Sequence, residues 1–215
     1  MLNAVNIVFC GVGGQGILLA SDIVALAALM TGCDIKKSEL HGMSQRGGSV
    51  ISHVRFGAKI YSPLVSSGNA DFLISFELLE TMRWTEFTNS DTRVIVLANK
   101  IKPETVERYP CEIEEQIKKT FRNLDFIEPG KTAEIFSDNK SFNMLPLGVL
   151  STYLELPDEY WEKAIGIRSP DKYYKENLSV FHAGRAFARE RKLVLPVFHE
   201  KIVTPRQQEF AVNNQ

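Results

Sequence analysis

Cysteine is scarce in this sequence, and its few positions exclude several kinds of site. Only three cysteines occur in 215 residues, at Cys10, Cys33 and Cys111, and no two share the short spacing of zinc or iron–sulfur ligands. An odd number of widely separated cysteines also argues against a disulfide framework. We therefore expect reduced thiols in a reducing compartment, and no metal cluster held by this chain alone.

An excess of charge and a long hydrophobic segment are also missing. Lys and Arg total 25 against 26 Asp and Glu, with a net charge of −1, so binding to nucleic acid or an anionic membrane is not expected. The longest apolar run, residues 23–30, is shorter than the roughly 20 residues that span a bilayer. The first residues lack the basic segment of a signal peptide, so we expect a cytoplasmic globular protein.

Strand and helix patterns alternate along the first part of the chain. Short apolar or alternating runs predict strands at residues 6–10, 34–38, 49–56, 71–76, 92–98 and 124–127. Helices are predicted at residues 17–30, 77–87 and 112–121. Residues 57–58 have the character of a turn and residues 59–61 of a returning strand, which predicts a hairpin and therefore a mixed sheet. This rhythm is typical of an α/β fold.

The pattern becomes helical toward the C-terminus. We expect a short helix after residues 129–130 and further helices at residues 143–154, 158–165 and 178–191, with breaks at Pro157 and Pro170. The predicted organisation is a single α/β domain over residues 1–204, with a core at 1–140 and a helical part at 141–204. Residues 205–215 are expected to form a C-terminal arm.

A glycine-rich motif follows the first predicted strand. Gly11, Gly13 and Gly16 satisfy G-x-G-x-x-G between a strand and a helix, the context of a dinucleotide site. Glu39, 23 residues after Gly16, lies where an acid that binds ribose would be expected. The alternative is that the glycines only permit a close strand–helix turn, and the sequence leaves both interpretations open.

A second glycine-rich segment, residues 41–48, follows the second predicted strand. Arg46 could offer a forked donor to phosphate or carboxylate, His41 a titratable contact, and Gly47 and Gly48 a close backbone approach. The alternative is a plain surface connection. Since both loops follow early strands of one sheet, we expect them to open together at its carboxyl edge, where α/β folds bind ligands.

Other reactive residue types have ordinary structural interpretations. His53 lies in an alternating strand, and His182 and His199 have no neighbours with metal-ligand spacing, so all three are predicted to be structural or solvated. Cys10 is predicted to be a small core residue, although the nearby helix N-terminus could lower its pKa.

Two motifs together resemble a known family. Residues 11–17, Gly-Val-Gly-Gly-Gln-Gly-Ile, are followed by residues 38–49, Ser-Glu-Leu-His-Gly-Met-Ser-Gln-Arg-Gly-Gly-Ser. This combination resembles the gamma subunit or domain family of 2-oxoacid:ferredoxin oxidoreductases, and within it the beta subunits of indolepyruvate ferredoxin oxidoreductases. Weaker matches follow in the expected order, at residues 143–148, 160–165 and 177–184.

The resemblance implies a fold, a reaction and a partner. The expected fold is a Rossmann-like three-layer sandwich with a mostly parallel sheet, a β-hairpin after the second strand and a helical C-terminal part. Such enzymes decarboxylate a 2-oxoacid oxidatively to an acyl-coenzyme A, using thiamine diphosphate and [4Fe–4S] clusters, and they reduce ferredoxin. This chain lacks the Gly-Asp-Gly of a thiamine site and has too few cysteines for a cluster. A large alpha subunit would carry both groups and act on an arylpyruvate.

By the same resemblance, both loops would face the alpha subunit and coenzyme A. The implied binding residues come from the two motifs: Gly11, Gly13, Gly14, Gln15, Gly16, His41, Gly42, Ser44, Gln45, Arg46, Gly47 and Gly48. No residue is identified as catalytic or as a metal ligand. Two alternatives stay open, a stand-alone NAD(P)- or FAD-binding dehydrogenase and a non-catalytic Rossmann-type regulatory module. The sequence also leaves open which 2-oxoacid is used and whether the isolated chain forms a homodimer.

Overall fold

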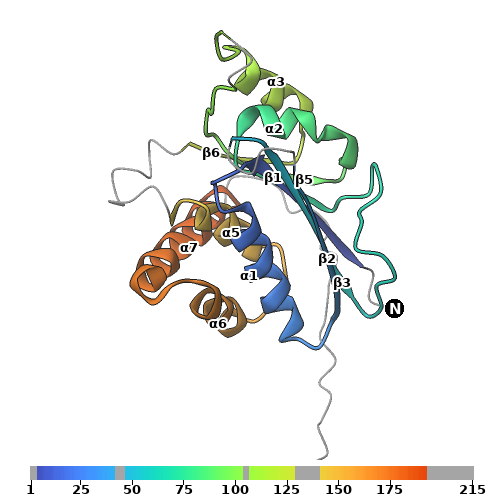
Figure 1. The fold of residues 1–215 in the computed structure, drawn as a ribbon, viewed down its shortest axis with the longest axis vertical. Helices are drawn as coiled ribbons and strands as arrows, with labels where there is room; N and C mark the ends of the chain where they lie inside the picture. Colours follow the sequence, from blue (N-terminus) through green and yellow to red (C-terminus); the bar gives the residue numbers. More distant parts are fainter. Residues whose placement is uncertain (1–3, 42–46, 104–106, 129–140, 193–215) are drawn as a thin grey trace, which may run out of the picture.

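The computed structural model describes residues 4–41, 47–103, 107–128 and 141–192, and it has a sheet with helices on both faces (Figure 1). The strands are β1 (Val5–Val12), β2 (Asp34–His41), β3 (Ser49–Gly57), β4 (Phe72–Ser75), β5 (Arg93–Leu97) and β6 (Leu124–Ile127). The helices are α1 (Ile17–Leu29), α2 (Leu78–Arg83), the 3₁₀ turn η1 (Thr85–Phe87), α3 (Ile113–Thr120), α5 (Met144–Ser151), α6 (Asp158–Arg168) and α7 (Asp171–Lys192). The α/β class is confirmed.

The sheet is mixed, with the strand order β2-β3-β1-β4-β5-β6. Strands β1, β4, β5 and β6 pair in parallel, whereas β3 lies between β1 and β2 and is antiparallel to both. Strand β2 therefore runs in the same direction as β1, and both end at the same edge of the sheet. Strand β1 is buried on both faces, which accounts for its continuous apolar run.

The predicted hairpin between residues 49–56 and 59–61 is wrong in its second strand. Residues 59–61 form no strand, and the hairpin joins β2 to β3 instead. The reason is that β1 and β2 already occupy both edges of β3, so a third partner has no hydrogen-bonding edge available. The segment is held at the start of β2, where the Ile60 N–H donates to the Asp34 carboxylate at 2.8 Å.

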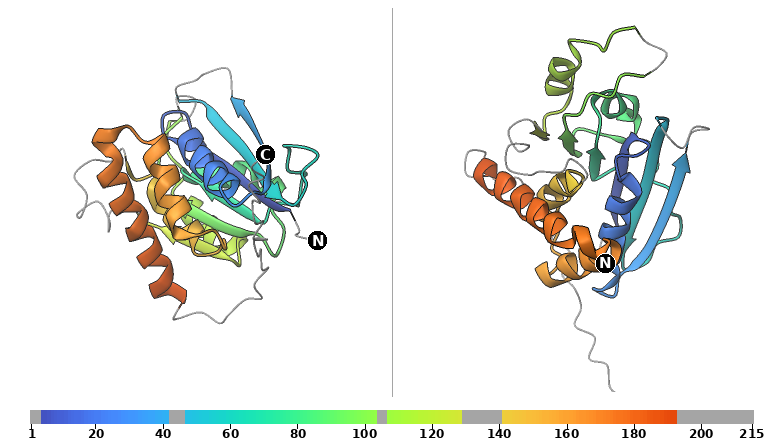
Figure 2. Two further views of the ribbon diagram at one scale, coloured as in Figure 1. Left: turned by 90° about the horizontal axis from the view of Figure 1, so that it is seen from below. Right: turned by 60° about the vertical axis from the view of Figure 1, so that its left-hand side comes forward.

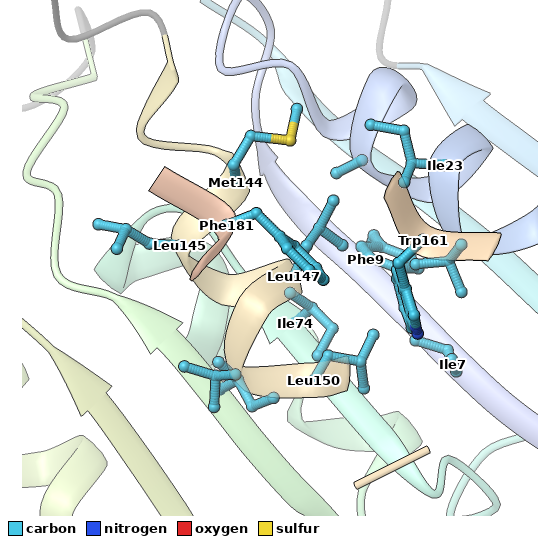
Figure 3. Packing of buried hydrophobic residues seen from close by; sticks show 14 of the residues in the cluster. Ile7, Phe9, Ile23, Ile74, Met144, Leu145, Leu147, Leu150, Trp161 and Phe181 are labelled. Carbon is cyan, nitrogen blue, oxygen red and sulfur yellow. The ribbon is translucent and has the colours of Figure 1, made fainter. Parts of the chain in front are cut away.

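Two hydrophobic cores lie on opposite faces of the sheet. One contains α1, α5, α6 and α7, and Figure 3 shows side chains of β1, α5 and α7 converging there with Trp161 of α6. Trp161 and Phe181 lie with their ring centroids 5.7 Å apart. The other core packs α2 and α3 against the opposite face (Figure 2). The elements therefore form three layers.

Helices α5 and α7 cross at very close range. A Cβ added to Gly148 would lie 2.0 Å from the Phe181 carbonyl oxygen, and one added to Gly184 would lie 2.2 Å from the Leu145 carbonyl oxygen. Both glycines belong to the weaker sequence matches, and they bring the two backbones into contact. The apolar helix α5 is consequently buried along its whole length.

The C-terminal helices confirm most of the predicted boundaries. Helix α7 begins at Asp171, earlier than the predicted start at residue 178, because its first turns are mostly polar and half-exposed and therefore carry a weak apolar period. Pro157 precedes α6 and Pro170 precedes α7, as expected. The short helix expected after residues 129–130 and the arm at 205–215 lie outside the described residues. Within the described ranges, no helix is long and apolar enough to cross a membrane.

Candidate functional site

The end of the second glycine-rich loop meets the first loop at the carboxyl edge of the sheet. Helix α1 leaves β1 toward one face, and α2 leaves the neighbouring β4 toward the other, which makes this edge a topological switch point of the kind that binds ligands in α/β folds. The Gly13 N–H donates to the Gly48 carbonyl at 2.8 Å. The end of the second loop therefore lies directly against the first.

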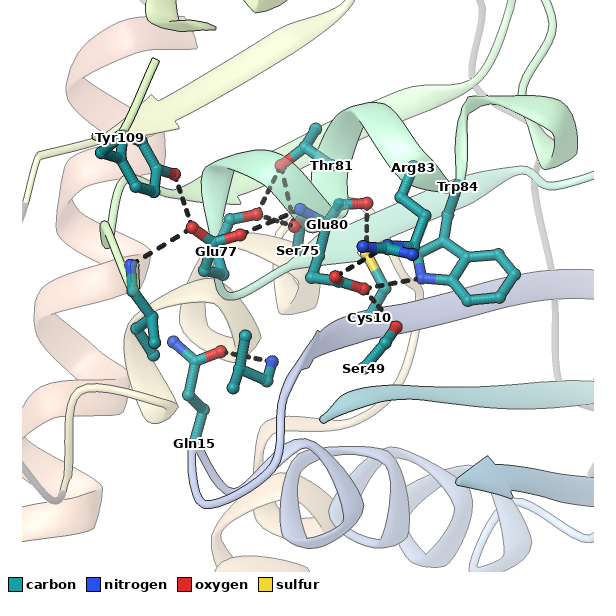
Figure 4. Close-up of polar contacts among 12 residues, drawn as sticks. Cys10, Gln15, Ser49, Ser75, Glu77, Glu80, Thr81, Arg83, Trp84 and Tyr109 are labelled. Carbon is teal, nitrogen blue, oxygen red and sulfur yellow. Dashed lines mark hydrogen bonds and ion pairs between the residues drawn. The ribbon is translucent and has the colours of Figure 1, made fainter. Parts of the chain in front are cut away.

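Gln15 closes the crevice between β1 and β4 with its own side chain. Its Oε1 accepts from the Val12 N–H at 2.7 Å, and its Nε2 donates to the Phe76 carbonyl at 2.6 Å. Figure 4 shows the side chain beside the end of β1. A dinucleotide that crosses this crevice would have to displace both hydrogen bonds.

Two of the three fingerprint glycines are required by internal packing. A Cβ at Gly11 would lie 2.8 Å from the Gln15 side-chain oxygen and 3.0 Å from the Phe76 Cβ. Gly16 has a φ of 78°, and a Cβ there would lie 2.1 Å from Asn143 Nδ2. By contrast, the neighbouring Gly14, which is not one of the three, has a φ of 103° and no atom within 4 Å of its added Cβ. The close-turn interpretation thus accounts for Gly11 and Gly16, and open space lies beside Gly14.

The N-terminus of α1 carries no side-chain cap and no acidic residue in its first turn. Free N–H groups at such a terminus favour an anion or another acceptor. Asn143, which is 6% exposed, covers Gly16, and its Oδ1 is buried without a hydrogen-bond partner. Asn143 belongs to one of the weaker sequence matches, but its contact with Gly16 was not predicted because the two residues are distant in the chain.

The structure separates Glu39 from the first loop. In a dinucleotide fold the acidic residue lies at the end of the strand next to β1. Here β3 takes that place, and Glu39 lies on the outer strand β2, paired in register with Ser52. Its carboxylate forms an ion pair with Lys37. The geometry therefore gives no support to Glu39 as a ribose ligand.

A pair of buried carboxylates near the loops was not predicted from the sequence. Glu77 is the N-cap of α2 and accepts from the Glu80 N–H at 2.9 Å and from the Tyr109 hydroxyl. Glu80 accepts from Trp84 Nε1 at 3.0 Å and from the Ser49 hydroxyl (Figure 4). Glutamate three residues after a helix-capping residue is a signal for the cap. No pattern in this polar segment indicates that both carboxylates are buried.

The buried thiol and imidazole in this region are structural. Cys10 is fully buried, and burial raises its pKa far above the ordinary value, so the core assignment is confirmed and the low-pKa alternative is wrong. His53 Nδ1 accepts from the Val65 N–H at 3.1 Å, and burial lowers the pKa of His53. All three cysteines are free. Within the described part of the chain, no group of three His, Cys, Asp or Glu side chains could hold a metal ion.

Much of the second loop lies outside the described residues. This holds for Gly42, Ser44, Gln45 and Arg46, and also for the His41 side chain. Gly47 and Gly48 are described, and Gly47 has a φ of 78°. The roles assigned to the loop residues therefore stay predictions.

Comparison with known proteins places the chain in a family. The sequence matches the family model described as pyruvate ferredoxin/flavodoxin oxidoreductase over residues 6–187. The chain belongs to this family. It is 36% identical over 187 residues to the indolepyruvate oxidoreductase subunit IorB of Archaeoglobus fulgidus, covering 83% of this chain and 92% of the relative. Identity to the Thermococcus kodakarensis subunit of the same description is 34% over 194 residues, covering 86% of this chain and 96% of the relative.

Solved structures share the fold at lower identity. The gamma subunit of a keto/oxoacid ferredoxin oxidoreductase from Geobacter sulfurreducens matches with a TM-score of 0.64 and 22% identity, over 86% of this chain and 99% of that one. A 2-oxoglutarate:ferredoxin oxidoreductase from Magnetococcus marinus, with 2-oxoglutarate, coenzyme A and succinyl-CoA bound, matches with a TM-score of 0.67 and 20% identity. This second match covers 87% of this chain and 31% of that one. Both matches establish the shared fold.

Proposed function

We propose that this chain is the small subunit of an indolepyruvate-type 2-oxoacid:ferredoxin oxidoreductase. The observation that carries the proposal is the 36% identity to the Archaeoglobus subunit across 92% of that subunit's length. A large subunit then carries thiamine diphosphate and the [4Fe–4S] clusters, decarboxylates an arylpyruvate and passes the electrons to ferredoxin. The small subunit contributes no acid, base or nucleophile of its own.

The carboxyl edge of the sheet fits a contact with coenzyme A. The uncapped N-terminus of α1 offers N–H donors for phosphate, and the space beside Gly14 is open. Arg46 adds a forked cation from the second loop. Coenzyme A supplies the thiol that takes the acyl group, and these residues of the small subunit hold its polar parts. The remaining loop residues face the large subunit.

The alternative of a stand-alone NAD(P)- or FAD-binding dehydrogenase has less support. The glycine fingerprint is its main argument, yet Gln15 fills the crevice at β1 and β4. Glu39 lies one strand too far from the loop and is ion-paired. A regulatory module without chemistry fits the geometry, but it gives no reason for the similarity to subunits of an oxidoreductase.

Co-expression with the large thiamine and iron–sulfur subunit tests the proposal. We expect the two chains to purify together and to reduce ferredoxin with indolepyruvate in a reaction that requires coenzyme A. The large subunit prepared alone should lose most of this activity. Failure of the chains to associate, or full activity of the large subunit by itself, would contradict the proposal.

Replacing Arg46 tests the contact with coenzyme A. In the assembled complex, Arg46→Ala should raise the KM for coenzyme A about ten-fold or more, because a charge-assisted hydrogen bond to phosphate is lost. The KM for the 2-oxoacid should stay unchanged. Arg189→Ala, on the exposed side of α7, is the matched control. An unchanged KM for coenzyme A in the Arg46 variant would exclude the phosphate role.

A further inference from the structure

The second glycine loop returns to the sheet at a point held by two hydrogen bonds. The Gly48 carbonyl accepts from the Gly13 N–H at 2.8 Å. The next residue, Ser49, begins β3 opposite Val12 of β1, and its hydroxyl donates to the Glu80 carboxylate. The returning chain is therefore tied to the first loop through its backbone and to α2 through one side chain.

Glu80 reaches this point from a buried position on the other face of the sheet. Glu80 is 5% exposed, and its Oε1 accepts from Arg83 Nε at 2.9 Å. Its Oε2 accepts from Trp84 Nε1 at 3.0 Å and from Ser49 (Figure 4). Arg83 and Trp84 lie within one helical turn of Glu80, so among these three bonds to the carboxylate, the bond from Ser49 is the one that comes from another element.

Burial of the Glu80 carboxylate is energetically unfavourable unless its oxygens accept hydrogen bonds. Removing a carboxylate from water costs several kcal/mol, which only good donors offset. Hydrogen bonds to an ionised acceptor are stronger and more directional than those between neutral groups. A buried, fully bonded carboxylate therefore holds the Ser49 hydroxyl, and with it the end of the loop, in one place.

We propose that Glu80 is a positioning residue for the glycine loops. Through Ser49 it holds Gly48, at the end of the second loop, against Gly13 of the first loop at the carboxyl edge. The positioning depends only on these contacts. Its consequence for coenzyme A rests on the proposed function, because that function makes the loops the binding surface.

The same cluster supplies matched controls. Glu77 is 1% exposed and also lies at the start of α2, but its carboxylate accepts from the Glu80 N–H, the Ile101 N–H and the Tyr109 hydroxyl, none of which belongs to a glycine loop. Ser75 is fully buried and bonds to Glu77 and Thr81. Substitutions at Glu77 and Ser75 disturb α2 without removing the bond to Ser49.

Amide hydrogen exchange of the full chain tests the positioning directly. Ser49→Ala should speed exchange at the Gly13 amide about ten-fold or more, because the hydrogen bond from Ser49 to the Glu80 carboxylate is lost. Ser49→Thr, which keeps the hydroxyl, should restore protection, and Ser75→Ala should leave Gly13 protected. The Ile95 amide, in the centre of β5, reports global unfolding in each variant. Equal exchange at Gly13 in Ser49→Ala and Ser75→Ala would overturn the proposal.

Kinetics of the assembled complex separate positioning from the ligand assignment. Ser49→Ala and Glu80→Gln should each raise the KM for coenzyme A several-fold with a smaller change in kcat, while Ser75→Ala and Glu77→Gln should leave that KM unchanged. A general loss of stability would lower the activity of all four variants alike, and that result would overturn the proposal. Faster exchange at Gly13 with an unchanged KM would support the positioning and contradict the contact with coenzyme A.

Discussion

The two faces of the sheet hold their helices near the carboxyl edge by different kinds of contact. On the face of α1, α5, α6 and α7, backbones approach through glycine, and the contacts are shaped by volume. On the face of α2 and α3, buried carboxylates collect hydrogen bonds from several segments. On the first face, the crossing of α5 and α7 therefore has no room for an added Cβ, whereas on the second face the loss of a carboxylate leaves buried donors without an acceptor. Between the two faces, the Gln15 side chain bonds to Val12 at the end of β1 and to Phe76 after β4.

The largest effect is expected at the crossing of α5 and α7. Gly148→Ala places a Cβ 2.0 Å from the Phe181 carbonyl oxygen, so the helices must separate, and the free energy of unfolding should fall by about 3 kcal/mol or more. Urea denaturation measures this loss. Gly166→Ala in α6 is the control, since its Cβ would meet only the Tyr174 ring at 3.3 Å. Equal losses in the two variants would contradict a crossing shaped by backbone contact.

The next effect should come from removing a carboxylate on the other face. Glu77→Ala deletes the N-cap of α2 and leaves the Tyr109 hydroxyl and the Ile101 N–H without their acceptor. We expect a loss of about 2 kcal/mol in the free energy of unfolding. Glu115→Ala, which breaks an exposed ion pair on α3, should lose less than about 0.5 kcal/mol. Similar losses would show that burial of Glu77 contributes nothing.

Gln15 should show a smaller effect, because its site is partly open to water. Gln15→Ala removes the bonds to Val12 and Phe76 and should lower the free energy of unfolding by about 1 kcal/mol. Gln116→Ala, on the exposed side of α3, should be neutral in the same denaturation experiment. No loss in the Gln15 variant would mean that the crevice is not closed by this side chain.

The smallest effect concerns pH. Burial lowers the pKa of His53 below its ordinary value of 6.5, so the unfolded chain binds a proton that the folded chain excludes. The contribution of neutral, buried His53 to the free energy of unfolding is fully present above pH 6.5 and is lost as the pH falls below that value. Denaturation at neutral pH and at about pH 5.5 should therefore show a stability difference that His53→Gln reduces. Gln116→Ala, an exposed position of α3 whose side chain does not titrate, should leave it unchanged.

The sequence was sufficient for the elements that carry a strong local pattern. Strand β1 and helix α1 were predicted because a strand buried on both faces and an apolar helix leave unbroken hydrophobic runs. The alternation in β3 indicated a strand but said nothing about its partners, so the hairpin was assigned to residues 59–61 instead of β2. Register and strand order depend on contacts between distant segments, which no local window contains.

The candidate site was predictable to a similar extent. The glycines of both loops were found from their motifs, and the structure places Gly48, at the end of the second loop, against Gly13 of the first. Their partners were not found, because Asn143 and Phe76 reach Gly16 and Gln15 from elements distant in the chain. Glu77 and Glu80 were missed because their burial depends on β3 and the segment around Tyr109, and a polar helix start gives no sign of it.

We propose that the glycine fingerprint serves a coenzyme A-dependent complex and that the chain's own side chains close it to a dinucleotide. Titration of the full chain with NADH, followed by nicotinamide fluorescence, tests this most directly. We expect no saturable binding, because Gln15 fills the crevice and Glu39 lies on the outer strand. Saturable binding in the micromolar range would contradict it and would favour a dehydrogenase.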